Sequence, residues 1–596
     1  GHYEGSRNRL SLATGVLNAK EASAQLRGAS DLSYDPQGAL SDVRFDMGLV
    51  KMALDMPGVF AAPVSLQSAV LRGDYLPPTH EVVVDRFTAL GPGMNFDASG
   101  KVTLAEKGSP GIALKGKMAA LPVAQFLRYW PIHLGEGPRD WIARNIFSGT
   151  IGPFLFQTDL AVGMLDQPQL PDNALNLSFG VKNLAGVYIK GLTQATQVQG
   201  SAVLTGDNFH AEFPSGRIGP LVLSHGTAAI ANLHVHGAIG VIGVHVDGAM
   251  PDIMTLIDMK PLGYPTRFGI KPSETGGTAS ADLAFRVPML RELPVSAVGI
   301  SVKAAVNNFA VTLGHTHITD GTVNFLIDND HLRQTGMVSL ADSRLAVDWT
   351  EDFNTKYFVT TRLAVKGVVK DGARSALNLG LEDIVNGPVD VTGTLTGHRG
   401  SLKSADLSLD LSQATLSVAF VGLGKPAGNA ASAHVTADFA PGDVVQDENV
   451  KITGPGITAN GTILFDRNGA LASLNFPSVK MGPLNDLSFS MTRSASGVDY
   501  EMRGHSLDGS KIGHNGAGNG AAGAGPRKDE MPEGPFHINA RLDRLALRDG
   551  VAITPFALDV SVIGNRPANL TLSGNLSRTA PIRASRCRSN FSCPTR

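Results

Sequence analysis

Apolar and polar residues alternate with a period of two over most of this chain, and that pattern constrains the fold more than any other feature. Successive side chains of a β-strand point to opposite faces, so such alternation is typical of strands with one apolar face. Gly, Pro, Asn and Asp separate the alternating runs about every 10–15 residues, which predicts a meander of short antiparallel strands. The apolar positions of the two clearest segments, 405–420 and 556–577, are Leu407, Leu409, Leu411, Val560, Val562, Leu570 and Leu572.

The length and composition of the chain indicate an extended body. Its 596 residues exceed what one hydrophobic core supports, so we expect several domains or one elongated repetitive structure. Charged residues make up 17%, below the usual quarter, whereas apolar residues are an ordinary 43%. An elongated body with an additional apolar face has this balance, and so does an inert Gly- and Ser-rich β protein.

Net charge and cysteine content indicate which partners the protein can bind and which redox compartment suits it. The net charge is −2, and because there is no basic field to collect phosphates, we expect no nucleic-acid binding. The cysteines are Cys587 and Cys593, and the cysteine-free remainder suits an oxidising compartment such as a periplasm. Residues 218–246 lack Asp, Glu, Lys and Arg, but their histidines, Asn and Pro are costly in hydrocarbon. We interpret this stretch as two or three strands rather than a membrane span.

Histidine pairs are the best candidates for a metal site. His234 and His236, and likewise His315 and His317, place two imidazoles on one face of an expected strand, and His245 is a further donor. No acidic or cysteine partner has motif spacing, so polar-face histidines are the simpler interpretation. We therefore predict no metal site.

Motifs for cofactor binding and catalysis are equally isolated. Gly518, Gly520 and Gly523 form a G-x-G-x-x-G, but it lies in a Gly- and Ala-rich run rather than between a strand and a helix. Acidic residues such as Asp406 and Asp410 lie on polar faces, and nothing selects a catalytic pair of carboxylates. We predict no cofactor and no catalytic residue.

A short signature interrupts the alternation at residues 121–151. Two tryptophans mark it, each beside a proline-led turn or helix. The segment resembles the helical insertion of the AsmA-like, YhdP-like proteins of Gram-negative envelopes. Looser matches at residues 251–290 and 547–556 extend the resemblance over most of residues 30–580. The signature positions, to which we assign a structural role, are Trp130, Pro131, Pro138, Trp141 and Ile146.

The resemblance implies a fold and a location. Such proteins are thought to form a long β-sheet curled into an open trough, and are implicated in moving phospholipid between the inner and outer membranes. It implies here a mainly β fold, an elongated and twisted antiparallel sheet with an apolar groove and few short helices. About 35 strands at about 4.8 Å each span on the order of 170 Å. It also implies a periplasmic central fragment whose inner-membrane anchor and outer-membrane-facing region lie outside this chain.

The predicted function is non-enzymatic intermembrane phospholipid transport, in which acyl chains travel in a β-lined groove. The seven apolar positions named first are its expected lining, and protein partners are unknown. A secreted β-solenoid or passenger-type adhesin is the alternative, although irregular strand spacing and helical insertions argue against its regular rungs. A β-rich envelope enzyme acting on glycans has no site to support it.

The predicted organisation follows from these signals. Helical signals cover residues 122–129, 138–147 and 251–259, with Pro138 expected at a first helical position. Residues 583–596 lack alternation; a truncated or frameshifted end is the preferred explanation of this segment, and a natural basic tail is the alternative. The expected segments are an N-terminal β-groove segment 1–117, a helical insertion 118–152, a central β-groove segment 153–508, a flexible Gly-rich loop 509–535, a β segment 536–582 and a disordered tail 583–596.

Overall fold

The structure is a computed structural model that describes residues 1–132, 136–189, 191–260, 263–290, 294, 297–354, 356–379, 381, 384–418, 421–440, 444–466, 471–512, 534–563 and 566–578. It is 67% strand and 10% helix, and 32 of the described strands belong to one mostly antiparallel sheet that is not closed into a barrel. The predicted mainly β fold with few short helices is therefore confirmed. Contacts divide the chain into two compact units: unit 1 is Gly1–Asn307 with Asn324–Asn329, and unit 2 is Asn308–Val323 with Asp330–Arg596.

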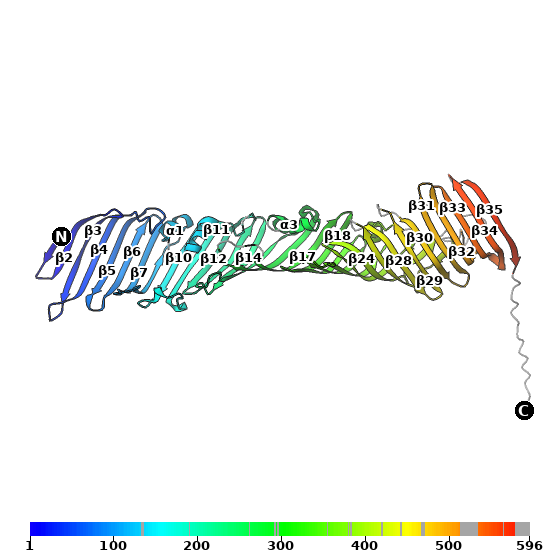
Figure 1. The fold of residues 1–596 in the computed structure, drawn as a ribbon. Coiled ribbons are helices and arrows are strands. Elements are labelled where there is room, and N and C mark those ends of the chain that lie inside the picture. Colours follow the sequence, from blue (N-terminus) through cyan, green and yellow to red (C-terminus); the bar gives the residue numbers. More distant parts are fainter. Residues whose placement is uncertain are drawn as a thin grey trace, which may run out of the picture. The chain divides into compact units, whose positions relative to one another are not determined.

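Unit 1 is a succession of strands with helical insertions (Figure 1). Its strands are β1 (His2–Glu4), β2 (Arg9–Asn18), β3 (Ala22–Tyr34), β4 (Leu40–Leu54), β5 (Val64–Leu76), β6 (Glu81–Gly91), β7 (Met94–Thr103), β8 (Gly111–Met118), β9 (Leu121–Pro122), β10 (Ile146–Thr158), β11 (Leu175–Gly186), β12 (Ala195–Thr205), β13 (Asn208–Ile218), β14 (Leu221–Ala231), β15 (Ile239–Ala249) and β16 (Thr275–Pro288). Its helices are α1 (Val123–Tyr129), α2 (Glu136–Asn145), α3 (Met250–Asp258) and α4 (Tyr264–Arg267), with 3-10 turns η1 (Pro77–Thr79), η2 (Met164–Asp166), η3 (Asp172–Ala174) and η4 (Pro272–Glu274). The division between the units falls within β17 (Gly299–Leu313) and β18 (Thr316–Asp328).

Unit 2 continues the same pattern and adds a small second sheet. Its main strands are β19 (His331–Leu340), β20 (Ser343–Asp352), β21 (Thr361–Val369), β23 (Val389–His398), β24 (Ser401–Asp410), β27 (Ser432–Ala440), β28 (Val444–Gly454), β29 (Ile457–Phe465), β30 (Leu471–Met481), β31 (Asn485–Ser494), β32 (Gly497–Asp508), β33 (Phe536–Ala546), β34 (Val551–Ile563) and β35 (Arg566–Arg578). The inserted elements are α5 (Asp371–Ala376) and the small sheet of β22 (Val385–Asn386), β25 (Thr415–Val418) and β26 (Leu423–Lys425), with 3-10 turns η7 (Gly509–Lys511) and η9 (Arg548–Gly550).

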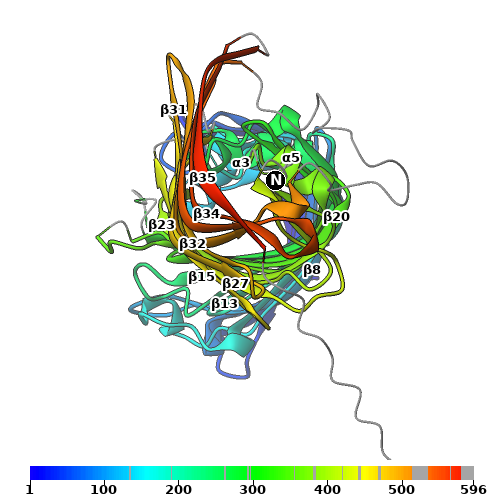
Figure 2. The same cartoon turned by 90° about the vertical axis from the view of Figure 1, so that its right-hand side faces the viewer.

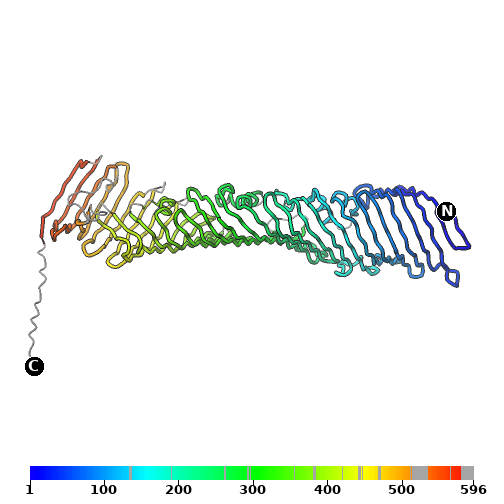
Figure 3. Tube along the Cα trace, turned by 180° about the vertical axis from the view of Figure 1, so that it is seen from behind, coloured from blue at the N-terminus to red at the C-terminus, as the bar shows by residue number. Residues whose placement is uncertain are grey.

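The main sheet grows by adding each strand beside the previous one, as the chain trace shows (Figure 3). In unit 1 the pairings run from β1–β2 to β15–β16, and β10 pairs with both β8 and β9. In unit 2 they run from β19–β20 to β34–β35. Among the described pairings one is parallel, β32–β33, which places Val498 opposite Phe536.

The insertions of each unit leave the sheet at one edge. Connections in an antiparallel meander alternate between the two edges. An even number of strands, β10 to β15, separates the α1–α2 insertion from the α3–α4 insertion, so both emerge at the same edge of unit 1 (Figure 1). In unit 2, β23 and β24 separate the α5–β22 insertion from the β25–β26 insertion, with the same result. Figure 2 shows α5 on the side around which the strands of unit 2 curve.

The structure tests two local expectations, and a third falls mostly outside the described residues. Residues 218–246 form the end of β13, β14 and most of β15, as expected of strands. The three helical signals correspond to α1, α2 and α3, but α2 begins at Glu136, so the expectation that Pro138 occupies a first helical position was wrong. Residues 513–533 of the predicted Gly-rich loop and the predicted tail 583–596 lie outside the described residues.

Candidate functional site

In unit 1, the strand register places apolar side chains opposite one another from strand to strand. Row A begins on β2 and ends on β16, and each neighbouring pair in it is directly opposed. Row B runs beside it on the same face. Row A is Leu12, Gly28, Met47, Leu71, Phe87, Ala98, Gly116, Phe156, Leu177, Leu204, Phe209, Ile230, Gly240 and Val287. Row B is Gly15, Leu26, Leu49, Ala69, Ala89, Phe96, Met118, Phe154, Phe179, Ala202, Ala211, Ala228, Ile242 and Phe285.

Glycine in these rows lets aromatic rings fold across the apolar face. Gly116 lies opposite Phe156, and a Cβ at Gly116 would be 2.6 Å from the ring of Phe156. The phenyl group therefore occupies the space that a side chain at position 116 would need. Phe156 also stacks on Phe96, with 5.7 Å between the ring centroids. The face is thus closely packed by its own side chains.

The opposite face of unit 1 is charged. Asp46 and Arg72 are opposed across β4 and β5 with a nitrogen–oxygen distance of 2.8 Å. Lys101 donates to Glu81 at 2.7 Å, and this hydrogen bond lowers the pKa of Glu81. Exposed pairs of this kind contribute only about 0–1 kcal/mol each. Their main effect is to mark this as the face that water covers, which we call the polar face.

The apolar face of unit 1 is only partly covered. Helices α1 and α2 pack over β8–β11, where Phe126 stacks on Phe154 with 4.9 Å between ring centroids. Elsewhere the small members of the rows, such as Ala202 and Ala211, are buried by their neighbours, whereas large ones such as Phe209 remain half-buried. Large apolar surfaces left without a second layer are rare in soluble proteins and mark binding surfaces.

The strand register of unit 2 also forms two rows of opposed side chains on one face, which we call row C and row D, but row C includes polar residues. Row C carries three of them, Gln334, Glu448 and Tyr500, whereas row D is apolar. Row C is Gln334, Trp349, Leu363, Leu395, Ala405, Ala437, Glu448, Ile463, Leu474, Met491, Tyr500, Ile538, Val560 and Leu570. Row D is Val338, Leu345, Gly367, Val391, Leu409, Ala433, Ile452, Ala459, Val479, Leu487, Gly504, Leu542 and Phe556.

The seven sequence-predicted lining residues lie on this face but in different surroundings. Leu411 is buried, and Leu407 and Leu409 are half-buried in a cluster with Ala414 and Leu416. At the other end of unit 2, β34 carries a half-buried and a buried valine, and β35 two leucines that are mostly exposed. Those four are Val560, Val562 at 8% exposed, Leu570 at 61% and Leu572 at 59%.

The small sheet covers part of the apolar face of unit 2. Its residue Leu423 packs in one cluster with Ile463 and Phe465 of β29. Two buried cations hold the insertion together. The Lys425 Nζ donates to the carbonyls of Ala414, Pro426 and Asn429 at 2.8–3.0 Å, and the Arg374 guanidinium donates to those of Val369, Val385 and Gly387 and to the carboxylate of Asp371. The alternation of apolar and polar residues could not predict that the small sheet packs here, because it indicates which face of a strand is apolar and not which element covers that face.

Sequence reasoning also missed Glu448, although the signal was present. On β28, Glu448 has the same phase as Val450 and Ile452, so alternation places it on the apolar face. Burial raises the pKa of its carboxyl to about 7.

The five signature residues lie in or beside the helices α1 and α2. The Trp130 ring lies 5.1 Å from that of Phe126, and its carbonyl accepts a hydrogen bond from Arg139. Ile146 packs against the cluster under α1, whereas Trp141 is 48% exposed. Pro131 is half-buried and Pro138 is exposed on α2.

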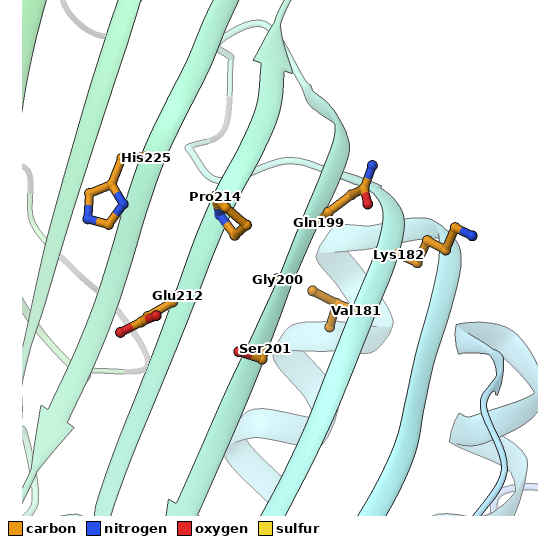
Figure 4. Close-up of a pocket in the computed structure, with 8 residues that line it drawn as sticks. All are labelled: Val181, Lys182, Gln199, Gly200, Ser201, Glu212, Pro214 and His225. Atoms are coloured by element: carbon orange, nitrogen blue, oxygen red, sulfur yellow. The ribbon is translucent and has the colours of Figure 1, made fainter.

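The polar face of unit 1 has an open depression (Figure 4). It crosses neighbouring strands β11–β14, and its charged members do not form a catalytic arrangement that we can identify. Glu212, for example, contacts His210 at 3.3 Å. Its lining residues are Val181, Lys182, Gln199, Gly200, Ser201, Glu212, Pro214 and His225.

The candidate metal histidines are dispersed. His234 and His236 lie in the turn after β14 rather than on a strand, so that expectation was wrong, and His234 contacts Asp207 at 2.8 Å. His245 contacts Asp282 at 2.6 Å, His315 lies in a turn and His317 on β18. Within the described residues, no three His, Cys, Asp or Glu side chains converge on a possible metal position.

Of the described strands, 32 thus form one open sheet, and in each unit one face of it carries the apolar rows. The family model described as YhdP protein matches residues 3–573, so the chain belongs to the YhdP family. No curated protein matches it. None of the helices in the described ranges is long and apolar enough to span a bilayer.

Proposed function

We propose that this chain is a non-enzymatic phospholipid transporter of the Gram-negative envelope, in which acyl chains lie on the apolar face of the sheet. The observation that carries the proposal is the continuity of rows A and B, which pass through β2–β8 and β10–β16 without a polar side chain. Membership of the YhdP family supports it.

Elementary energetics agree with this role. Each methylene removed from water contributes roughly 0.8 kcal/mol, so acyl chains gain stability along an uninterrupted apolar face. Headgroups remain in water beyond the strand ends. The step needs no cofactor, nucleotide or catalytic residue of this chain, and a location in the periplasm between inner- and outer-membrane attachments suits it. A β-solenoid adhesin instead requires closed rungs, which an antiparallel meander does not form.

The test is site-specific photo-crosslinking in cells. A benzoylphenylalanine replaces Phe209 of row A in one variant and its neighbour His210 on the polar face in the other. Mass spectrometry should find phospholipid adducts at position 209 and few at position 210. Equal, low yields at both positions would count against the proposal.

A further inference from the structure

Glu448 is an acid in the middle of an apolar row. In the register it lies between Ala437 of β27 and Ile463 of β29, both of which are buried. Along its own strand, Val450 and Ile452 continue the same face. The carboxyl group is therefore placed where rows A and B have only carbon.

The charged groups around Glu448 do not compensate it. Facing it are Val435, Ala437 and Phe439 on β27 and Gly461, Ile463 and Phe465 on β29, all apolar. Asp438, Asp447 and Lys451 have the opposite phase and lie on the polar face. On the covering small sheet, the Lys425 ammonium group is committed to three carbonyls. Among the described residues, none donates a hydrogen bond or an opposite charge to Glu448.

This placement makes the charge of Glu448 sensitive to what covers it. A carboxylate without partners in apolar surroundings favours its neutral form, and burial accordingly raises the pKa of Glu448 to about 7. Acyl chains lying across it would remove more water and raise the pKa further. By linkage, protonation must then strengthen lipid binding by the same factor.

We propose that protonation of Glu448 controls the occupancy of row C by acyl chains: the neutral acid admits them and the hydrated carboxylate displaces them. The inference rests on the proposed function and adds a regulation to it. If lipid loading raises the pKa by one unit from 7, the affinity at pH 8 falls about fivefold below the affinity at pH 6. Lipid on rows A and B is unaffected.

The experiment measures lipid binding at row C itself. A benzoylphenylalanine replaces Tyr500 of row C in the whole chain, and the concentration of phosphatidylglycerol that gives half-maximal crosslinking at that position is measured between pH 5.5 and 8.5. Glu448→Gln fixes the side chain in a neutral form, so its affinity should be independent of pH. Asp447→Asn, one residue away on the polar face, should keep the fivefold change. A Glu448→Gln variant with the pH dependence of the wild type overturns the inference.

A second measurement follows the titration of Glu448 in the wild-type protein and uses Glu448→Gln only to assign its signal. Carbon-13 carboxyl resonances of glutamate, with the Glu448 signal identified by difference, give its pKa in the empty and the lipid-loaded wild-type protein. The pKa should rise on loading, and an ordinary value near 4.3 in both states overturns the inference. Lipid bound equally at every pH contradicts only the role of Glu448, whereas no lipid at any pH contradicts the proposed function itself.

Discussion

The apolar faces of unit 1 and unit 2 have the same construction but different content. Rows A and B of unit 1 carry only apolar residues, and the helices α1 and α2 cover them over β8–β11. Row C of unit 2 carries Gln334, Glu448 and Tyr500, and an inserted three-stranded sheet packs on rows C and D. If the proposed function holds, the face of unit 1 takes up acyl chains passively, whereas access to the face of unit 2 depends on its polar members and its cover.

The comparison predicts that a charge on an uncovered row stops transport without unfolding the sheet. An acidic residue facing hydrocarbon costs about 2.5–3.5 kcal/mol at a bilayer centre, so Ile242→Asp in row B should reduce lipid transfer roughly a hundredfold. Because water can reach this half-buried position, strand protection in hydrogen exchange should change little. Val241→Asp, the neighbouring position on the polar face, is the matched control. Normal transfer by Ile242→Asp would contradict the role of unit 1.

The same change under the small sheet should instead affect folding. Leu409 shares a cluster with Leu416 of β25, so Leu409→Asp should destabilise β23–β27 by about 2 kcal/mol or more. Hydrogen exchange of these strands, together with lipid crosslinking at position 409, measures the effect, and Ser408→Asp on the other face is the control. A stable variant with lipid adducts at position 409 would mean that the small sheet leaves row D open.

Loosening the small sheet tests whether its cover is permanent. Lys425→Met leaves three carbonyls without their donor, which should cost about 1–2 kcal/mol locally. Exchange of β25 and β26 should quicken while that of β19–β21 stays unchanged, and lipid crosslinking in row C should increase. Lys451→Met, on the polar face of β28, should do neither. Crosslinking that stays constant despite faster exchange would show that the cover does not limit access.

The smallest effect concerns pH on the polar face of unit 1. The hydrogen bond to Asp282 raises the pKa of His245, so its stabilising contribution is full below the unfolded pKa, near 6.5, and is lost as pH rises through the folded pKa. Asp282→Asn should lower the histidine pKa and leave lipid binding unchanged. A ring titration of His245 by NMR checks this, and a wild-type pKa at or below 6.5 would contradict it.

Alternation predicted the strands and their apolar phase well, because the side-chain period of a strand is a local property. It correctly placed Leu409 and Leu570 on the same kind of face. It could not distinguish their surroundings. Leu409 is covered by Leu416 of β25, and the sequence of that inserted strand alternates like the strands of the main sheet. The turn after β14 that holds His234 was missed for a related reason. The sequence around His234 alternates like a strand, and its contact with Asp207 is visible only in the structure.

The parallel pairing β32–β33, the one such pairing among those described, has a consequence for assembly of the sheet. At most other pairings of unit 2, a short connection brings a new strand back beside its predecessor, so the sheet can form step by step between sequence neighbours. Val498 must instead wait for Phe536, which lies far along the chain, and that long separation must be closed before any bond of this pair forms. Strands β33–β35 are therefore expected to form their own antiparallel ribbon first and to dock on β32 as a late, separate event.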